Sequence, residues 1–314
     1  MTRQMLNRRQ ALMTGAALPL AAAMGAGLAT PTPARASAPM MGAGSTPFSR
    51  FVLGEFEVTT ILAGTRTVPE PQKIFGTDVT PERFAEVSAE NMIPTDKAQF
   101  FFTPTVVNTG SELILFDTGL NPEGITAALG AAGYTPDQVD TVVLTHMHGD
   151  HIGGLMGTDG ATFANARYVT GAKEFDAWDM SGNEGFEGKV RPLAEKMTFL
   201  DDGGAVSSGI TAMAAHGHTA GHMGYMLESQ GKQLLIGADF ANHYVWSLAY
   251  PEWEVLYDQD KAAAAATRKR LLGMMAADKI PFIGYHMPFP GHGFVEARDS
   301  GYRYVPSSYQ MMLG

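Results

Sequence analysis

The hydrophobic positions of this chain fall mostly in short runs, which are typical of β-strands. Alternation of apolar and polar residues predicts a hairpin of two short strands between residues 51 and 62. Apolar runs on both sides of the turn Asn108-Thr109-Gly110 predict a second hairpin over residues 106–116. The remaining strand predictions are 139–144, 167–169, 210–214, 225–228, 233–236 and 280–284.

Helical segments alternate with these strands. Helices are predicted over residues 80–91, over about 122–132, from about residue 172, and from a cap at Asp258 through Ala277. The last of these helices carries Arg268, Lys269 and Arg270, which we expect to form a solvated face. Strands and helices mixed in this order indicate an α/β fold.

The first 38 residues are interpreted as an export signal and are left out of the fold. The pair Arg8-Arg9 precedes a weakly apolar run, and Ala36-Ser37-Ala38 offers a small-residue cleavage site. A membrane anchor is the alternative, but glycine and proline interrupt the run. Twin-arginine signals resemble those of proteins exported already folded, so we expect a periplasmic or secreted protein. Residues 39–49 are expected to form a flexible arm, and residues 50–314 a single domain.

Composition limits the partners and the chemistry. Removal of the signal leaves 18 basic and 32 acidic residues, which changes the net charge from −10 to −14. Since no basic cluster follows the signal, nucleic acid is not an expected partner, and no further apolar run is long enough to anchor the chain in a membrane. The chain has no cysteine, which excludes disulfides, thiolate metal ligands and cysteine nucleophiles.

The predicted strand 139–144 leads into the most informative stretch of the chain, THMHGDHIGG at Thr145–Gly154. Because a strand turns successive side chains to opposite faces, His146 and His148 can point to one ion from the same side. The loop that follows can bring Asp150 and His151 to a second ion beside the first. Neutral imidazole suits zinc and its neighbours in the series, and a carboxylate offsets the charge of the ion.

This H-x-H-x-D-H stretch resembles the metal-binding signature of the metallo-β-lactamase superfamily. The segments AHGHTAGH, GAD and YHMPFPGHG are similar as well, and they resemble the branch that contains methyl parathion hydrolase and the N-acyl-homoserine lactonases. The resemblance covers about residues 50–310 and implies an αββα sandwich, in which two mixed β-sheets are flanked by helices. It also implies two divalent metal ions, zinc in the first place, with manganese, iron or cobalt as alternatives.

The resemblance extends the ligand set beyond the first loop. His222 is the expected third ligand of the first ion, whereas His216 and His218 are expected in the core. For the last ligand position, His286 is preferred to His292 because it directly follows a predicted strand. The expected metal ligands are therefore His146, His148, Asp150, His151, His222, Asp239 and His286.

Three carboxylates receive further roles. Asp239 is expected to bridge both ions, with the cap of a turn as the alternative. Asp150 and Asp239 are assigned a catalytic role, because the ions that they hold would lower the pKa of a bridging water and supply a hydroxide at neutral pH. Asp117 resembles an aspartate that orients a ligand imidazole, with a simple turn as the alternative.

The expected function is hydrolysis of a lactone or ester, with side activity on aryl phosphotriesters. Trp178 and Phe186 are assigned to the substrate pocket by resemblance to methyl parathion hydrolase. Tyr244 and Trp246 lie in an aromatic stretch that could form a pocket wall, a homodimer contact or ordinary core. Because the net charge disfavours anions, the expected substrate is a small neutral molecule with an apolar portion.

Other functions remain open at this point. An organophosphate hydrolase is the first alternative, although the aromatic residue expected shortly after Asp117-Thr118-Gly119 is absent. A periplasmic β-lactamase is the second, although Asp239 stands where those enzymes usually place cysteine or serine. A di-iron redox protein and a non-catalytic metal-binding protein are weaker alternatives, because the first typically needs a flavin-binding domain and the ligand set argues against the second.

Overall fold

The structure is a computed structural model that describes residues 43–298 and 301–313. The predicted signal at residues 1–38 and the first four residues of the predicted arm lie outside the described residues. The compact unit described below begins at Ser45, and its first strand begins at Phe48, inside the predicted arm. Within the described ranges, no helix combines the length and the apolar character that a membrane crossing requires.

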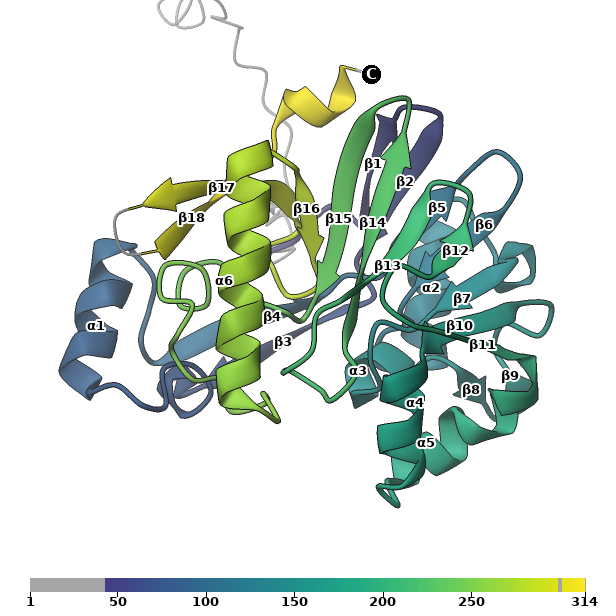
Figure 1. Ribbon diagram of the computed structural model, residues 1–314, viewed down its shortest axis with the longest axis horizontal. Helices are drawn as coiled ribbons and strands as arrows, with labels where there is room; N and C mark the ends of the chain where they lie inside the picture. The colour runs from purple at the N-terminus through teal and green to yellow at the C-terminus, as the bar shows by residue number, and fades with distance from the viewer. Residues whose placement is uncertain (1–42, 299–300, 314) are drawn as a thin grey trace, which may run out of the picture. The chain divides into compact units, whose positions relative to one another are not determined.

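The first of two large sheets contains seven strands in the order β1-β2-β5-β6-β7-β10-β11 (Figure 1). Pairing is antiparallel from β1 to β6 and parallel from β6 to β11, so the sheet is mixed. The strands are β1 (Phe48–Leu53), β2 (Phe56–Ile61), β5 (Thr105–Asn108), β6 (Leu113–Phe116), β7 (Thr141–Val143), β10 (Arg167–Gly171) and β11 (Met197–Leu200).

The second sheet contains seven strands in sequential order from β12 to β18. Only β15 and β16 pair in parallel, and the other neighbours are antiparallel. The strands are β12 (Ala205–Ser207), β13 (Ile210–Ala214), β14 (Met223–Ser229), β15 (Lys232–Ala238), β16 (Phe282–Gly284), β17 (His292–Arg298) and β18 (Gly301–Pro306). Two small hairpins complete the strands: β3 (Gly64–Pro69) with β4 (Lys97–Phe102), and β8 (Met156–Gly157) with β9 (Gly160–Ala161).

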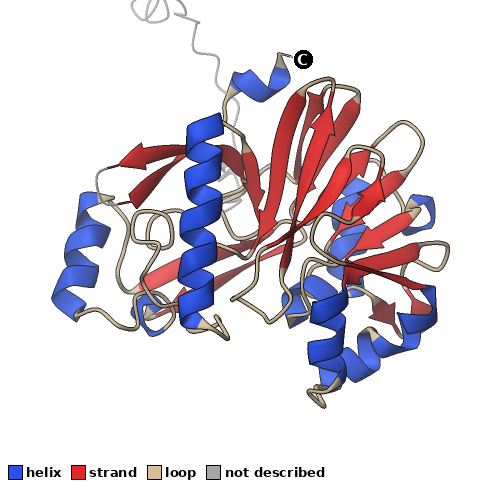
Figure 2. Ribbon diagram, in the orientation of Figure 1, coloured by secondary structure: helices blue, strands red, loops and turns tan. Residues whose placement is uncertain are grey.

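Helices cover the outer faces of this pair of sheets (Figure 2). The α-helices are α1 (Pro81–Glu90), α2 (Pro122–Ala131), α3 (Gly149–Ile152), α4 (Ala172–Asp179), α5 (Glu184–Lys189) and α6 (Lys261–Asp278). Short 3-10 helices lie at Pro71–Lys73, Pro136–Gln138, Arg191–Lys196 and Tyr309–Met312. The predicted helix at 80–91 is confirmed, including its cap, because the Thr80 side chain accepts a hydrogen bond from the backbone N–H of Arg83.

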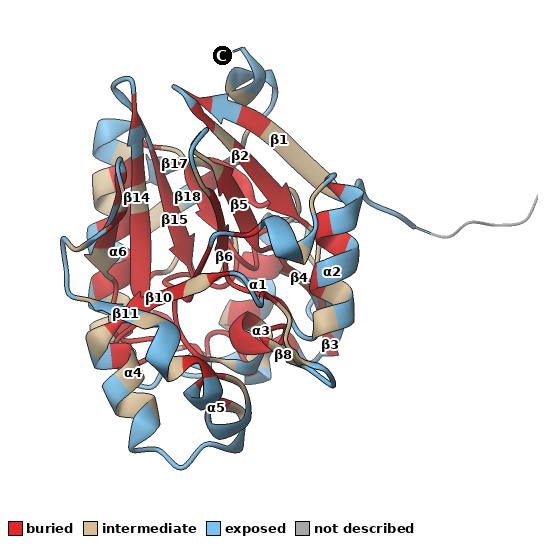
Figure 3. Cartoon of the chain, turned by 90° about the vertical axis from the view of Figure 1, so that its right-hand side faces the viewer, coloured by how far each residue is buried: buried red, intermediate tan, exposed pale blue. Residues whose placement is uncertain are grey.

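Consecutive strand residues separate the core into layers. Val107 and Val143 face the second sheet, whereas their neighbours Val106 and Val142 pack against α2 with Leu129. This is the alternation that a strand imposes, and it explains why apolar residues follow one another in strands that are buried on both faces. Figure 3 shows the strands buried and the outer faces of the helices exposed. The predicted αββα sandwich of two mixed sheets is confirmed.

The start of α6 corrects two predictions. Its cap is Asp260, whose side chain accepts from the backbone N–H of Ala263. Asp258 instead forms a buried ion pair with Arg268 at 2.7 Å, and Arg268 also donates to the carbonyl oxygens of Pro251 and Trp253. Arg268 is therefore fully buried and is not part of a solvated face.

Candidate metal centre

The candidate site is built where strands of the two sheets end. β7 leads into the first histidine loop, residues 145–154, which includes the short helix α3. β13 leads into the second histidine loop, residues 216–222, while Asp239 and His286 follow β15 and β16. Pairing fixes the strand ends within each sheet, and the core between the two sheets holds the sheets together, so residues far apart in sequence meet at one edge of the fold.

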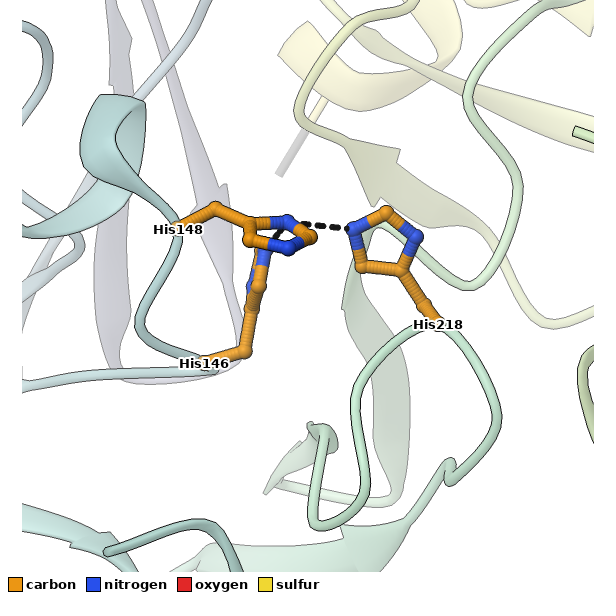
Figure 4. Close-up of side chains that lie close together, drawn as sticks. All are labelled: His146, His148 and His218. Atoms are coloured by element: carbon orange, nitrogen blue, oxygen red, sulfur yellow. Dashed lines mark hydrogen bonds between the residues drawn. The ribbon is translucent and has the colours of Figure 1, made fainter. Parts of the chain in front are cut away.

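Three imidazoles converge on one point (Figure 4). Nε2 of His146 lies 3.1 Å from Nδ1 of His148, and that Nδ1 lies 2.9 Å from Nε2 of His218. His146 and His148 come from the first histidine loop, and His218 comes from the second. The three nitrogens form a group that could hold one metal ion.

A second group lies beside the first and consists of Asp150, His151 and His286. Oδ2 of Asp150 lies 3.7 Å from Nε2 of His151 and 3.3 Å from Nε2 of His286. His292 lies elsewhere, in β17, where its ring nitrogens contact Ser49 and Ser307. The structure therefore places His286, and not His292, at this position.

Asp239 lies between the two groups. Its Oδ2 is 3.4 Å from Nε2 of His218 and 3.1 Å from Nε2 of His286, and its Oδ1 is 3.5 Å from Nε2 of His151. Asp239 also forms a group of its own with His146 and His151. One carboxylate thus faces imidazoles of both groups, which is the position expected of a ligand shared by two ions.

The donor atoms fit metal ions. Nε2 of His151 and Oδ1 of Asp239 are buried and have no hydrogen-bond partner among the described residues. Buried polar atoms are rarely left unpaired, and a cation held between them would satisfy both. The imidazole and carboxylate set suits zinc or a neighbouring divalent ion.

The outward nitrogens of the rings support the same conclusion. Nδ1 of His151 donates to Asp117 at 2.8 Å, Nδ1 of His218 donates to Asp258 at 3.0 Å, and Nδ1 of His286 donates to the carbonyl oxygen of Phe101 at 2.9 Å. A proton on Nδ1 leaves the inward Nε2 of a neutral ring with a lone pair, as a metal ligand requires. Asp117 also accepts from the backbone and hydroxyl of Thr145.

Electrostatics differ between the two groups. Burial lowers the pKa of His148 to about 4, so this imidazole is neutral near pH 7. Burial also acts to lower the pKa of His286, but the carboxylates of Asp239 and Asp150 outweigh it and raise that pKa to about 10. The carboxylates around His151 and His286 therefore favour a positive charge at the second group. A divalent cation provides that charge and displaces the proton.

His222 does not take the ligand position that the sequence analysis gives it. Its Nε2 accepts a hydrogen bond from the backbone N–H of Asp239 at 3.1 Å, so this lone pair is already used. Within the part of the chain that the structure describes, its buried Nδ1 has no hydrogen-bond partner, and none of the potential ligand groups contains His222. His218, which was assigned to the core, occupies the third position of the first group instead.

The superfamily model described as metallo-beta-lactamase matches residues 103–281, more than half of the chain. The chain belongs to the metallo-β-lactamase superfamily. With its groups of histidine and aspartate, it is a metal-dependent hydrolase of that superfamily.

Two curated relatives carry the description beta-lactamase-like protein 2 homolog. The Caenorhabditis elegans protein is 30% identical over 131 residues, which cover 40% of this chain and 40% of the relative. The Drosophila melanogaster protein is 26% identical over 195 residues, which cover 60% of this chain and 58% of the relative. The alignments thus span about half the length of these relatives.

Solved structures share the fold over a larger part of the chain. AidC, described as a dizinc quorum-quenching lactonase in complex with a product, has 24% identity and a TM-score of 0.77 over 84% of this chain and 98% of AidC. The hydrolase AbOPH of the β-lactamase superfamily has 24% identity and a TM-score of 0.78 over 85% of this chain and 100% of AbOPH. A B. thuringiensis AiiA mutant with bound N-decanoyl-L-homoserine has 18% identity and a TM-score of 0.58, over 76% of this chain and 99% of AiiA. At these identities the likeness shows the fold alone.

A cavity of about 400 Å³ opens onto the metal groups of this superfamily member. Its floor contains His148, Gly149, Asp150, His218, Asp239 and His286. Its walls are apolar and consist of Val68, Phe100, Phe102 and Leu120, with Arg66 and Tyr257 as polar additions. Most of these wall residues belong to the hairpin of β3 and β4, which the sequence analysis does not predict.

The four aromatic residues assigned to the substrate pocket are not part of this wall. Phe186 is fully buried and packs against Phe175 at 5.3 Å between ring centroids. Trp178 lies closer, with its ring centroid 5.8 Å from that of His148, but its indole N–H donates to Glu174. Tyr244 and Trp246 line a second cavity of about 460 Å³, which shares His286 with the first. Trp246 is also a buried core residue, and Tyr244 is partly buried against the same cluster.

Proposed function

We propose that this chain hydrolyses small neutral lactones and carboxylic esters with the help of two divalent metal ions, zinc in the first place. The observation that carries the proposal is the cavity described above, which has candidate metal ligands on its floor and apolar side chains in its walls. An enzyme for a lactone needs both features, because the reacting ester is polar and the remainder of such a substrate is apolar.

The proposed ligands follow the geometry of the two groups. His146, His148 and His218 would hold the first ion, Asp150, His151 and His286 would hold the second, and Asp239 would contact both. When bound, such a pair of ions polarises a carbonyl oxygen and lowers the pKa of a water. Asp117, Asp258 and the carbonyl of Phe101 keep the ligand imidazoles oriented through their Nδ1 atoms.

The walls determine which substrates enter. Phe100 and Phe102 are buried strand residues that offer fixed apolar surfaces to an acyl chain or a ring. Arg66 and Tyr257 are exposed side chains that can donate hydrogen bonds to a carbonyl oxygen of the substrate. The AidC description supports the lactone class, since that protein has the same fold and is named a lactonase.

Hydrolysis of aryl phosphotriesters is proposed as a weaker side activity. A metal-assisted attack can reach phosphorus as well as a carbonyl carbon. However, the segment Asn121-Pro122-Glu123 lacks the aromatic residue that the resemblance to methyl parathion hydrolase implies shortly after Asp117-Thr118-Gly119, and the nearby wall residue Leu120 is aliphatic. A nitrophenyl leaving group therefore has one aromatic side chain fewer to stack on, so we expect weaker binding of aryl phosphotriesters.

The proposal is tested with a panel of four substrates. The protein, loaded with zinc, is assayed against an N-acyl-homoserine lactone, an aryl acetate, methyl parathion and nitrocefin. We expect the highest kcat/KM for the lactone or the ester, loss of activity with a chelator, and recovery when zinc is added. A phosphotriester or β-lactam preference of about ten-fold, equal to about 1.4 kcal/mol of transition-state stabilisation, would overturn the proposed substrate class.

A further inference from the structure

Glu174 is a carboxylate that the proposed chemistry does not use. It lies in the first turn of α4 and is fully buried. Its Oε1 accepts from the backbone N–H of Met147 at 3.0 Å and from the indole N–H of Trp178 at 2.7 Å. Its Oε2 accepts from the hydroxyl of Thr219 at 2.8 Å and from the backbone N–H of Gly221 at 2.9 Å. A buried carboxylate is costly, and these four donors offset its desolvation.

The donors tie together the two loops that carry the first group of ligands. Met147 lies between His146 and His148 in the first histidine loop. Thr219 directly follows His218 in the second histidine loop. Each oxygen of Glu174 serves a different loop, so one side chain fixes the distance between them.

The backbone around Glu174 is closely packed as well. A methyl group on Gly221 would lie 2.1 Å from the backbone nitrogen of Glu174, so the second histidine loop rests directly on α4. A carboxylate in the first turn of a helix also interacts favourably with the helix dipole. Backbone packing and hydrogen bonds therefore both hold the second histidine loop against Glu174.

We infer that Glu174 is a positioning residue that joins the two histidine loops and holds His146, His148 and His218 at the spacing that a metal ion requires. The inference rests on the proposed metal-dependent function. It differs from a general packing role, because it requires that metal affinity changes in protein that is still folded.

Glutamine is an informative replacement at this position. It has the shape of glutamate, but one of its two oxygens becomes an NH2 group, which cannot accept a hydrogen bond. If the amide turns its NH2 toward Met147, the first loop loses its acceptor, and if it turns toward Gly221, the second loop loses its acceptor. In either orientation, Glu174→Gln therefore leaves the backbone N–H of one loop, that of Met147 or that of Gly221, without its acceptor.

The test measures the dissociation constant of zinc by competition with a chromophoric chelator, in folded protein as judged by circular dichroism. We expect Glu174→Gln to weaken the first site by about 10- to 100-fold, the usual effect of losing a partner of the ligand shell. The absorption spectrum of the cobalt-loaded protein should change as well, since it reports the ligand geometry. Glu187→Gln is the matched control, because it makes the same substitution in an exposed ion pair with Arg191, outside both histidine loops; its zinc affinity should stay within about three-fold of the wild type.

Thr219→Val decides the case in which Glu174→Gln does not fold. It removes one donor of the second loop, keeps the carboxylate, and should weaken zinc binding, whereas Glu187→Gln should not. The inference would be overturned if folded Glu174→Gln had wild-type zinc affinity and an unchanged cobalt spectrum. If Glu174→Gln does not fold, the same result for Thr219→Val would overturn it. Either result would leave the proposed function intact. A wild-type protein that binds no metal would instead overturn both, so the two failures are distinguishable.

Discussion

The two histidine loops use similar sequences in different ways. In the first loop, His146, His148, Asp150 and His151 all lie in the candidate metal groups, as the local spacing predicts. In the second loop only His218 lies in a group, although His222 is equally buried. The first loop continues into the helix α3 and packs against residues 118–120, whereas the second packs against α4 and α6.

The second loop shows what local spacing leaves open. Its backbone contacts α6 at Gly217, where a methyl group would lie 2.2 Å from the backbone nitrogen of Ala264, and α4 at Gly221. These two contacts lie on either side of His218 in the loop. His218 is turned toward His148, and His222 is turned toward the backbone of Asp239.

The largest expected effect separates the two histidines directly. His218→Ala should lower zinc affinity and hydrolytic activity by more than about 100-fold, since it removes a proposed ligand and not merely a partner of one. His222→Ala should keep two zinc ions per chain and lose stability instead. Metal analysis of both purified variants is the measurement. Full occupancy in His218→Ala together with loss of metal in His222→Ala would reverse the assignment.

The second largest expected effect concerns Asp258, which orients the imidazole of His218. Asp258 accepts from His218 and also balances the buried Arg268. Asp258→Asn leaves that guanidinium without a carboxylate, so we expect a loss of about 3 kcal/mol in the free energy of unfolding, along with weaker zinc binding. Urea unfolding of the metal-free protein measures the first quantity. Lys269→Ala is the control, because Lys269 pairs with Glu252 at the exposed surface and should cost less than about 1 kcal/mol.

A pair of glycines, one from each loop, tests how tightly the loops are packed. Gly221→Ala should cost about 2 kcal/mol in the free energy of unfolding, because its methyl group meets the backbone of Glu174. Gly149→Ala places a methyl group where no atom lies within 4 Å, at the start of a helix, and should be neutral or slightly stabilising. Equal effects of the two substitutions on urea unfolding would show that the backbone around Gly221 yields to the added methyl group.

The same contrast explains how much of the molecule could be predicted. Hairpins with clear turns, such as 106–116, and the capped helix at 80–91 depend on neighbouring residues, and the structure has both. The hairpin of β3 and β4 was missed because α1 lies between its strands. Arg268 was expected at the surface because Lys269 and Arg270 follow it, and only the packing of Asp258 reveals its burial. Contacts between residues far apart in the sequence, such as these, cannot be predicted from the pattern of neighbouring residues.

The smallest expected effect is a pH dependence that follows from the buried His222. Burial lowers the pKa of His222 to about 3, whereas an unfolded histidine has a pKa of about 6.5. Between about pH 6.5 and pH 3, the unfolded chain therefore binds a proton at His222 that the folded chain does not bind. This difference has no effect on the free energy of unfolding above about pH 6.5, and it lowers that free energy as the pH falls toward 3. In metal-free protein, the free energy of unfolding of the wild type should fall by up to about 1.4 kcal/mol per pH unit more steeply than that of His222→Gln. Glutamine can still accept from the backbone of Asp239, so the variant keeps that contact without the titration. Urea unfolding between pH 7 and pH 4.5 measures the difference, and parallel curves for the two proteins would show that His222 is not held neutral by burial.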